Sequence, residues 1–160
     1  IDGIDGLAAS IVGIFIILYE YFSANTTDFR ILSLIILALL ASFLYFNFKK
    51  EKKIFLGDSG SLFLGGLVSV YVLNILSSNY LIKTNYDINK ILFVISILSY
   101  PIFDIIRVFF FRILNGRSPF IADKKHIHHL LHTKFKSHIK TTLFIAFLSI
   151  LFMILIQILF

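Results

Sequence analysis

The sequence contains no cysteine and few charged residues. Its 160 residues therefore form no disulfide, offer no thiolate chemistry and supply no cysteine-ligated zinc site, although the redox compartment stays open. Charged residues make up 15% of the chain and hydrophobic residues 58%, with a mean hydropathy of +0.92. A soluble domain is typically about 25% charged and about 45–50% apolar. The composition excludes an ordinary soluble domain and indicates a polytopic membrane protein.

What is present is a series of five apolar segments, each close to the length that crosses a bilayer as a helix. They cover about residues 7–22, 29–46, 61–78, 91–114 and 141–160. Neither strand-like alternation nor a repeat is visible, and a helix lets such a run satisfy its own backbone in lipid. We expect an all-α bundle of about five transmembrane helices. Because the chain opens on Ile1, in what looks like the middle of a motif, we expect residues 1–160 to be the C-terminal part of a single, longer integral-membrane domain.

Basic residues are concentrated between these segments on one side of the predicted membrane. The net charge of +6 could point to nucleic acid, but in a membrane protein it fits loops beside anionic lipid, so we expect no nucleic-acid partner. Twelve of the 15 Lys and Arg residues fall on this side: Lys49, Lys50, Lys52, Lys53, Arg107, Arg112, Arg117, Lys124, Lys125, Lys134, Lys136 and Lys140. The positive-inside rule makes that side cytoplasmic. Residues 1–6 then face the cytoplasm too.

Two Asp–Gly motifs lie at membrane boundaries on this face. In the first, Asp2 and Asp5 are separated by Gly3 and Ile4, so both carboxylates can turn toward one point, as suits a hard cation such as Mg²⁺. In the second, Asp58 lies in Gly-Asp-Ser-Gly-Ser, whose glycines permit close backbone approach to a ligand. A structural alternative stays open for each motif, because Asp and Ser are favoured helix N-caps.

Asp104 and Arg107 lie inside the fourth apolar segment. A charge in lipid is costly, so we do not expect Asp104 to be buried without a partner. The favoured interpretation is an ion pair one turn apart, with Arg107 reaching toward the interface. Pro101, one turn earlier, interrupts the backbone ladder and allows the helix to bend.

The stretch from Arg112 to His132 is rich in basic residues and histidines. Arg112, Arg117, Lys124 and Lys125 are candidate phosphate binders, accompanied by four imidazoles. Zinc is one alternative, since two of the histidines share a helical face at i,i+4, but no Glu lies between them. A basic helix lying on anionic lipid is another, which accounts for the cations but not for the imidazoles. The four histidines are His126, His128, His129 and His132.

Taken in order, these motifs resemble those of a known family. Residues 2–8 look like the end of its Asn-x-x-Asp-Gly-x-Asp-Gly-Leu motif, and residues 57–65 look like its Gly-Asp-x-Gly-Ser motif. Pro101-x-x-Asp104, then Ser118-Pro-Phe-x-x-Asp123, then His126-Ile-His-His resemble its C-terminal loop. The family is the polyprenyl-phosphate N-acetylhexosamine-1-phosphate transferases of the MraY/WecA type (glycosyltransferase family 4). The Ser-Pro-Phe and His-x-His-His features look more like the WecA/TagO branch.

The resemblance implies an Mg²⁺-dependent transferase, with Mn²⁺ as a substitute ion. It would move a sugar-1-phosphate, GlcNAc-1-phosphate first among the candidates, from a UDP-N-acetylhexosamine to undecaprenyl phosphate, release UMP and start a cell-surface glycan. It implies a multi-pass protein of the bacterial inner membrane with its active site in the cytoplasm, and a homodimer is compatible with it. Catalysis would rest on Asp5, Asp58, His128 and His129, with Asp58 and Asp5 at the metal and with Asp2, His126, Arg112, Arg117 and Ser118 binding substrate.

Two departures from the family pattern bear on this interpretation. The family's N-terminal Asp-Asp motif and the Asn that opens its Asp-Gly motif would lie before Ile1, so this stretch alone is expected to be inactive.

Two other functions stay open as alternatives. A transporter or channel lined by Asp58, Asp104 and Arg107 is one of them. It requires polar residues at several depths, whereas four of the five segments are nearly uncharged through their middles. A zinc-dependent intramembrane hydrolase is the other.

Overall fold

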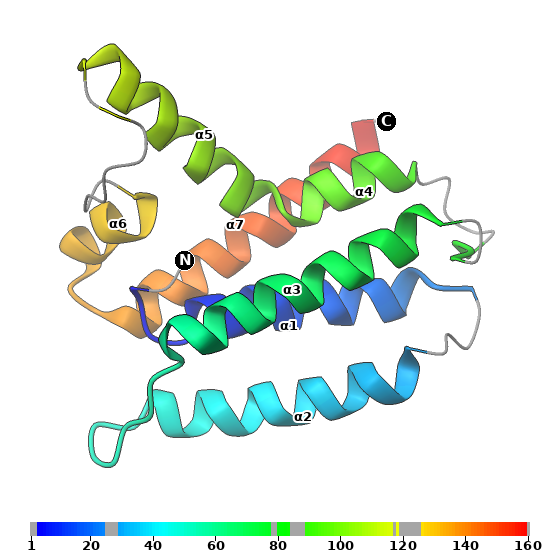
Figure 1. Cartoon of the computed structure of the whole chain (residues 1–160), viewed down its shortest axis with the longest axis horizontal. Helices are drawn as coiled ribbons and strands as arrows, with labels where there is room; N and C mark the ends of the chain where they lie inside the picture. Colours follow the sequence, from blue (N-terminus) through cyan, green and yellow to red (C-terminus); the bar gives the residue numbers. More distant parts are fainter. Residues whose placement is uncertain are drawn as a thin grey trace.

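The protein is helical throughout the part that the structure describes. The computed structural model describes residues 3–24, 29–77, 80–83, 89–116, 118 and 126–159. These residues form seven helices and no strand apart from an isolated bridge between Ser23 and Ile82 (Figure 1). The helices are α1 (Leu7–Phe22), α2 (Arg30–Asn47), α3 (Gly57–Leu76), α4 (Lys90–Ile97), α5 (Ser99–Leu114), α6 (Ile127–Phe135) and α7 (His138–Leu159). The all-α prediction is confirmed.

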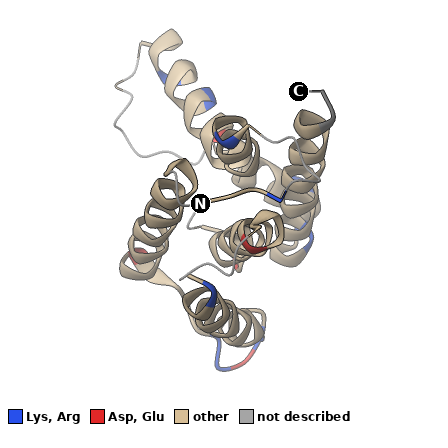
Figure 2. Cartoon of the chain, turned by 90° about the vertical axis from the view of Figure 1, so that its right-hand side faces the viewer, with Lys and Arg blue, Asp and Glu red and all other residues tan. Residues whose placement is uncertain are grey.

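Three of these helices, α2, α3 and α7, are long and apolar enough to cross a membrane. The pair α4 and α5 also passes as one span, although the two are bent by 69°. The apolar helix α1 is shorter, at 16 residues. Most of the helical ribbon consists of residues other than Lys, Arg, Asp and Glu (Figure 2). The prediction of a polytopic helical membrane protein is therefore confirmed, with three or four candidate spans by length and composition.

Helix α1 lies at the centre of the bundle and packs against α2, α3 and α7 (Figure 1). Its buried side chains recur every three or four residues, as one face of a helix requires. They are Leu7, Ala9, Ile11, Val12, Phe15, Ile16, Tyr19 and Phe22. This packing fixes where the short segment before α1 meets the other helices.

Polar contacts join α1, α2 and α3 near the C-terminal end of α1. The Tyr19 hydroxyl donates to Asn74 Oδ1 (2.7 Å), and the Ser33 hydroxyl contacts both Glu20 Oε1 (2.6 Å) and the Tyr71 hydroxyl (2.8 Å). Interhelical hydrogen bonds in membranes are worth about 0.6–2 kcal/mol each. They fasten the end of the bundle opposite the residues described below.

Helix α3 begins earlier than the apolar pattern predicts. The third apolar segment was expected from about Ser61, whereas the helix starts at Gly57 and includes Asp58 in its first turn. An acidic residue in the first turn is favourable because it faces the positive end of the helix dipole. The N-cap residue is Leu56, and no side chain caps the helix. The capping alternative for Asp58, Ser59 and Ser61 is therefore wrong.

The capping alternative is also wrong for Asp5. Gly6 occupies the N-cap position of α1 with φ 70°, and no described side chain caps this helix. Glycine suits this left-handed conformation, and a Cβ at Gly6 would lie 2.4 Å from Cζ of Phe48. The turn at Gly6 thus brings the N-terminal segment against the end of α2, and the Asp5 carboxylate is left to make other contacts.

The fourth apolar segment is not one continuous helix, contrary to the prediction. It breaks at Leu98 into α4 and α5, and Pro101 is the third residue of α5. Proline is tolerated in a first helical turn but has no N–H to continue the ladder from α4. The predicted bend near Pro101 is confirmed, and α5 leans away from the other helices (Figure 1).

Candidate active site

A cavity of about 340 Å³ opens where the first residues of α1 meet the end of α2 and the start of α7. In Figure 1, the N-terminus, the starts of α3 and α7, and α6 all lie at this end of the bundle. Four side chains that can bind polar groups line the cavity: Asp5, Asn47, Lys53 and His138. Phe43, Phe55 and Leu56 supply apolar walls. The cavity thus combines charge, hydrogen-bonding groups and aromatic surface.

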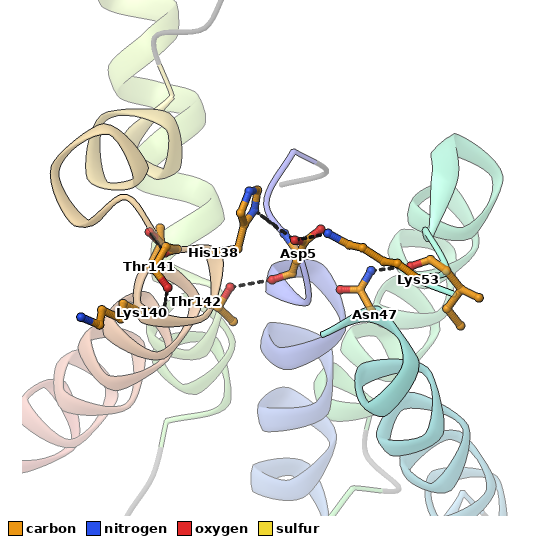
Figure 3. A network of polar contacts seen from close by, with 9 residues as sticks. Asp5, Asn47, Lys53, His138, Lys140, Thr141 and Thr142 are labelled. Carbon is orange, nitrogen blue, oxygen red and sulfur yellow. Dashed lines mark hydrogen bonds and ion pairs between the residues drawn. The ribbon is translucent and has the colours of Figure 1, made fainter. Parts of the chain in front are cut away.

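Asp5 is held from two sides of this cavity (Figure 3). Its Oδ2 forms an ion pair with Lys53 Nζ and lies 3.4 Å from Nδ1 of His138. The backbone N–H of Asp5 donates to the same His138 nitrogen (3.2 Å), and the Thr142 hydroxyl donates to its backbone carbonyl (2.8 Å). The carboxylate is therefore fixed at the cavity wall between α7 and the segment before α3.

Asn47, the last residue of α2, carries an unmet hydrogen-bond acceptor. Its Nδ2 donates to the Ile54 carbonyl (2.7 Å), but its Oδ1 is buried and has no partner among the described residues. Such groups are rare in folded proteins, because losing water without gaining a partner costs about 1–3 kcal/mol. Since Asn47 lines the cavity, a ligand N–H is a natural partner for it.

The histidines of the predicted motif lie together at the start of α6. The His126 and His128 rings stack with centroids 5.4 Å apart, and those of His128 and His129 are 4.4 Å apart. His128 is buried, and its Nδ1 shares a 3.1 Å hydrogen bond with the Tyr100 hydroxyl. Burial, followed by the nearby His129 ring, lowers the pKa of His128 to about 4. The imidazole of His128 is therefore neutral at pH 7.

The Asp–Gly segment reaches these histidines at Gly3. A Cβ built on Gly3 would lie 3.2 Å from Cε1 of His129 and 3.4 Å from Nε2 of His128. The absent side chain lets the backbone lie directly against both rings. Two motifs more than 120 positions apart in the sequence thus meet at one end of the bundle.

His132 does not share a site with His128, as a zinc pair at i,i+4 would require. Its ring lies 4.2 Å from that of His138, at the start of α7. Among the described residues, no group of three or more His, Asp or Glu side chains is arranged to hold a metal ion. His132 and His138 instead connect the histidine segment to the residues that hold Asp5.

Asp58 lies apart from Asp5 in the described contacts. It is exposed in the first turn of α3 and does not line the cavity, although Phe55 and Leu56 just before it do. Two carboxylates at one end of the bundle still fit the donor chemistry of Mg²⁺, which takes one or two carboxylates and completes its shell with water and substrate phosphate. The metal roles of Asp58 and Asp5 stay predictions.

The remaining predicted substrate-binding residues lie outside this cavity or outside the described residues. Arg112 is half-buried in the last turn of α5, and Ser118 is exposed just beyond that helix. Asp2 and Arg117 fall outside the described residues. The sequence interpretation missed Asn47 and Lys53. The sequence interpretation uses Lys53 only as a topology signal and places Asn47 just after the second apolar segment, at the start of the basic loop.

Comparison with known proteins agrees with the motifs. The family model described as glycosyl transferase family 4 matches residues 1–76. A probable undecaprenyl-phosphate N-acetylglucosaminyl 1-phosphate transferase of Bacillus subtilis (strain 168) is 40% identical over 96% of this chain and 42% of its own length. A decaprenyl-phosphate N-acetylglucosaminephosphotransferase of Mycolicibacterium smegmatis is 30% identical over 91% of the chain and 39% of its own length.

A relative from the peptidoglycan branch matches a smaller part. A phospho-N-acetylmuramoyl-pentapeptide-transferase of Fervidobacterium nodosum is 42% identical over 45% of the chain and 23% of its own length. No solved structure gives a significant match. The chain spans about two fifths of the length of the two relatives that match nearly all of it. The resemblance found in the sequence is confirmed, and the chain belongs to glycosyl transferase family 4.

Proposed function

We propose that the chain is part of a transferase that moves GlcNAc-1-phosphate, or a related N-acetylhexosamine-1-phosphate, from a UDP-sugar to undecaprenyl phosphate. The observation that carries the proposal is the meeting of the Asp–Gly segment with His128 and His129, beside the cavity that holds Asp5. The similarity to proteins named as polyprenyl-phosphate N-acetylglucosamine transferases supports the same reaction. The product would start a cell-surface glycan such as teichoic acid or lipopolysaccharide.

The cavity beside Asp5 suits the nucleotide of the donor. Asn47 Oδ1 can accept a hydrogen bond from a ring N–H such as that of uracil, and it has no other partner among the described residues. Phe55, which is 74% exposed, offers a face for stacking, and Lys53 offers a cation to phosphate. The nucleotide would enter with its base toward the end of α2 and its diphosphate toward the histidines.

The histidines would bind the diphosphate. Because Tyr100 can donate its hydroxyl hydrogen to Nδ1 of the neutral His128, Nε2 of that ring is left to carry the proton and donate it to a phosphate oxygen. His126 and His129 flank it, and Arg112, Arg117 and Ser118 would bind the same phosphates or their surroundings. Such preorganised donors stabilise charge as it develops. Asp58 and Asp5 would hold Mg²⁺, which would supply positive charge to offset that of the diphosphate and of the departing UMP.

In the reaction, an oxygen of the acceptor phosphate forms a bond to the phosphorus that carries the sugar. The bond from that phosphorus to the UMP oxygen breaks, and UMP leaves with the electron pair. A lipid phosphate is largely ionised near neutral pH, so the acceptor needs little help from a base. The chain's own contribution is to hold and orient the two phosphates. The positive-inside count supports a cytoplasmic site in the inner membrane of a bacterium.

The test uses the complete protein in membranes, supplied with UDP-GlcNAc and undecaprenyl phosphate. We expect Asp58→Asn to reduce Mg²⁺-dependent UMP release to background, because the amide removes the negative charge of the metal ligand. Ser69→Ala, on the exposed side of the same helix, is the control and should turn over normally. Near-normal turnover by Asp58→Asn would exclude the metal role of Asp58. A wild-type protein with no transfer to the lipid would exclude the proposed function.

A further inference from the structure

Asp104 is buried within the bent span and uses both carboxylate oxygens. Its Oδ1 accepts the backbone N–H of Ile127 (2.8 Å) and lies 3.3 Å from Nη2 of Arg107. Its Oδ2 accepts the Nδ1–H of His126 (2.7 Å). The predicted Asp104–Arg107 pair is thus confirmed, but two of these three hydrogen bonds go to the histidine segment, and Nδ1 of His128 also lies 3.9 Å from Oδ2. The ion pair alone does not account for the position of this carboxylate.

The Asp104 carboxylate accepts a hydrogen bond from the start of α6, as the side chain of an N-cap residue usually does for its own helix. The first amides of a helix have no partner within it. His126 is the N-cap residue of α6, and its side chain caps nothing. The Asp104 carboxylate takes the amide of Ile127, the first residue of α6, and places negative charge at the positive end of that helix. The start of α6 is therefore set by a residue of α5.

A second residue of the same α5 face acts one turn earlier. Tyr100 precedes Asp104 by four positions, so the two side chains lie one above the other on the helix. Tyr100 holds Nδ1 of His128, while Asp104 holds Nδ1 of His126. In both rings the contact occupies Nδ1 and leaves Nε2 for a ligand. The two contacts set the orientations of the stacked rings.

We propose that Asp104 is a positioning residue of the transferase: it fixes the start of α6 and the His126 ring to the bent span, so that the histidines face the substrate diphosphate. This inference rests on the proposed function for the role of the histidines. Asp104 itself need not touch substrate, because its oxygens are used by His126, Ile127 and Arg107. The tilt of α5 after the 69° bend and the placement of the histidines are thereby linked.

The experiment compares Asp104→Ala and Asp104→Asn in the complete protein, with Asn115→Ala as the matched control. Asn115, the C-cap residue of α5, is also hydrogen-bonded, but its side chain donates to the Phe111 carbonyl of the same helix and not to the histidine segment that the structure describes. Transfer to undecaprenyl phosphate is measured at varied UDP-GlcNAc. We expect Asp104→Ala to lower kcat/KM about 10- to 100-fold, the usual effect of removing a group that orients a site residue. Asp104→Asn retains an acceptor for the Ile127 amide and should lose less.

A double-mutant cycle separates positioning from a general loss of folding. If Asp104 acts through His126, then Asp104→Ala combined with His126→Ala should be little worse than the worse single variant. Additive losses would overturn the inference. Turnover by Asp104→Ala within twofold of the wild type would overturn it as well.

A second measurement does not depend on activity. Spin labels at Phe110→Cys in α5 and Lys134→Cys in α6, both exposed, report the separation of the two helices in a cysteine-free version of the complete protein. We expect a narrow distance distribution in the wild type and in Asn115→Ala, and a broader one in Asp104→Ala. Unchanged distances in Asp104→Ala would overturn the inference even if activity fell. An inactive wild type with the expected distances would count against the proposed function but would leave the anchoring of α6 established.

Discussion

His128 is a buried imidazole whose two nitrogens lie in different surroundings. Nδ1 meets the Tyr100 hydroxyl, and Nε2 lies 3.4 Å from the position that a Cβ on Gly3 would take. Burial lowers its pKa to about 4, and His129 acts in the same direction, whereas Asp104 opposes the shift. A neutral ring in this position can donate one hydrogen bond without adding a buried positive charge. In the proposed function, the diphosphate would therefore be bound by an uncharged His128.

The first prediction concerns this titration. In the complete protein labelled with ¹³C-histidine, the resonance of His128, assigned by its loss in His128→Gln, should show no protonation between pH 7 and 5. Below about pH 6.5 the His128 side chain binds a proton in the unfolded chain, whereas in the folded chain it stays unprotonated. The free energy of unfolding should therefore fall as pH drops from 6.5 toward 4, and it should fall less in His128→Gln. Titration of His128 near pH 6.5 would contradict the prediction.

At the scale of elements, the short turn before α1 is built around Gly6. Its left-handed φ of 70° and its close approach to Phe48 and Leu44 allow the end of α2 to pack against the N-terminal segment. Asp5 precedes this turn and Asn47 ends α2, so the same contact forms one wall of the cavity. The geometry of the site thus depends on the packing of two helix ends.

The second prediction is that Gly6→Ala weakens both folding and binding. The new Cβ would approach within 2.4 Å of Phe48 and would also strain the backbone, for a combined cost of about 1–3 kcal/mol. Gly66→Ala, where a Cβ meets open space within a helix, is the control and should be neutral or slightly stabilising. Thermal unfolding in detergent and binding of UDP provide the measurements. A Gly6→Ala variant as stable as Gly66→Ala would show that the turn can relax.

The sequence predicts those features of the helices that depend on neighbouring residues. It does not predict the features that depend on contacts between distant residues. Hydropathy located every apolar helix, since span length and periodicity are local properties. It did not reveal that Gly57 starts α3, because the glycines of the first turn have low helix propensity and hydropathy does not register the helix dipole, which Asp58 complements. Pro101 marked the bend, but only the structure gave its size and showed that the segment becomes two helices.

The residues of the candidate site show the same difference between local and long-range features. Asp5 and the histidines could be named from motif chemistry, and the structure places them at one end of the bundle. Asn47 became a candidate only through its buried, unpaired oxygen, a property of packing that no local pattern encodes. The bond from Asp104 to the amide of Ile127 joins residues 23 positions apart, and the sequence offered only the nearer Arg107 as a partner.

At the scale of the whole molecule, the two ends of the bundle are built differently. One end carries the Asp5 cavity, the basic segment after α2, and the histidines (Figure 1). The other end is held by contacts among Tyr19, Ser33, Tyr71 and Asn74. This division agrees with the proposed function, and the positive-inside rule predicts that the first end faces the cytoplasm.

The third prediction tests that orientation. Arg30 and Lys50 are exposed near opposite ends of α2, so single cysteines at these positions report the two sides of the membrane. In intact cells, a membrane-impermeant maleimide should label Arg30→Cys but not Lys50→Cys in a cysteine-free version of the complete protein. Permeabilising the cells should expose Lys50→Cys. The opposite pattern would invert the topology and remove the cavity from the compartment that contains UDP-sugars.

The 16 residues of α1 have a consequence for the surrounding lipid. At 1.5 Å per residue this helix is about 24 Å long, whereas the hydrocarbon layer of a bilayer is about 30 Å thick. A span that is too short draws the bilayer thinner around itself or is flanked by polar groups that reach inward. If α1 crosses the membrane, as the proposed topology requires, Asp5 directly precedes the turn into α1 and would lie near the level of the lipid phosphates. Under the proposed function, a polyprenyl phosphate could then present its head group at the cavity without leaving the membrane.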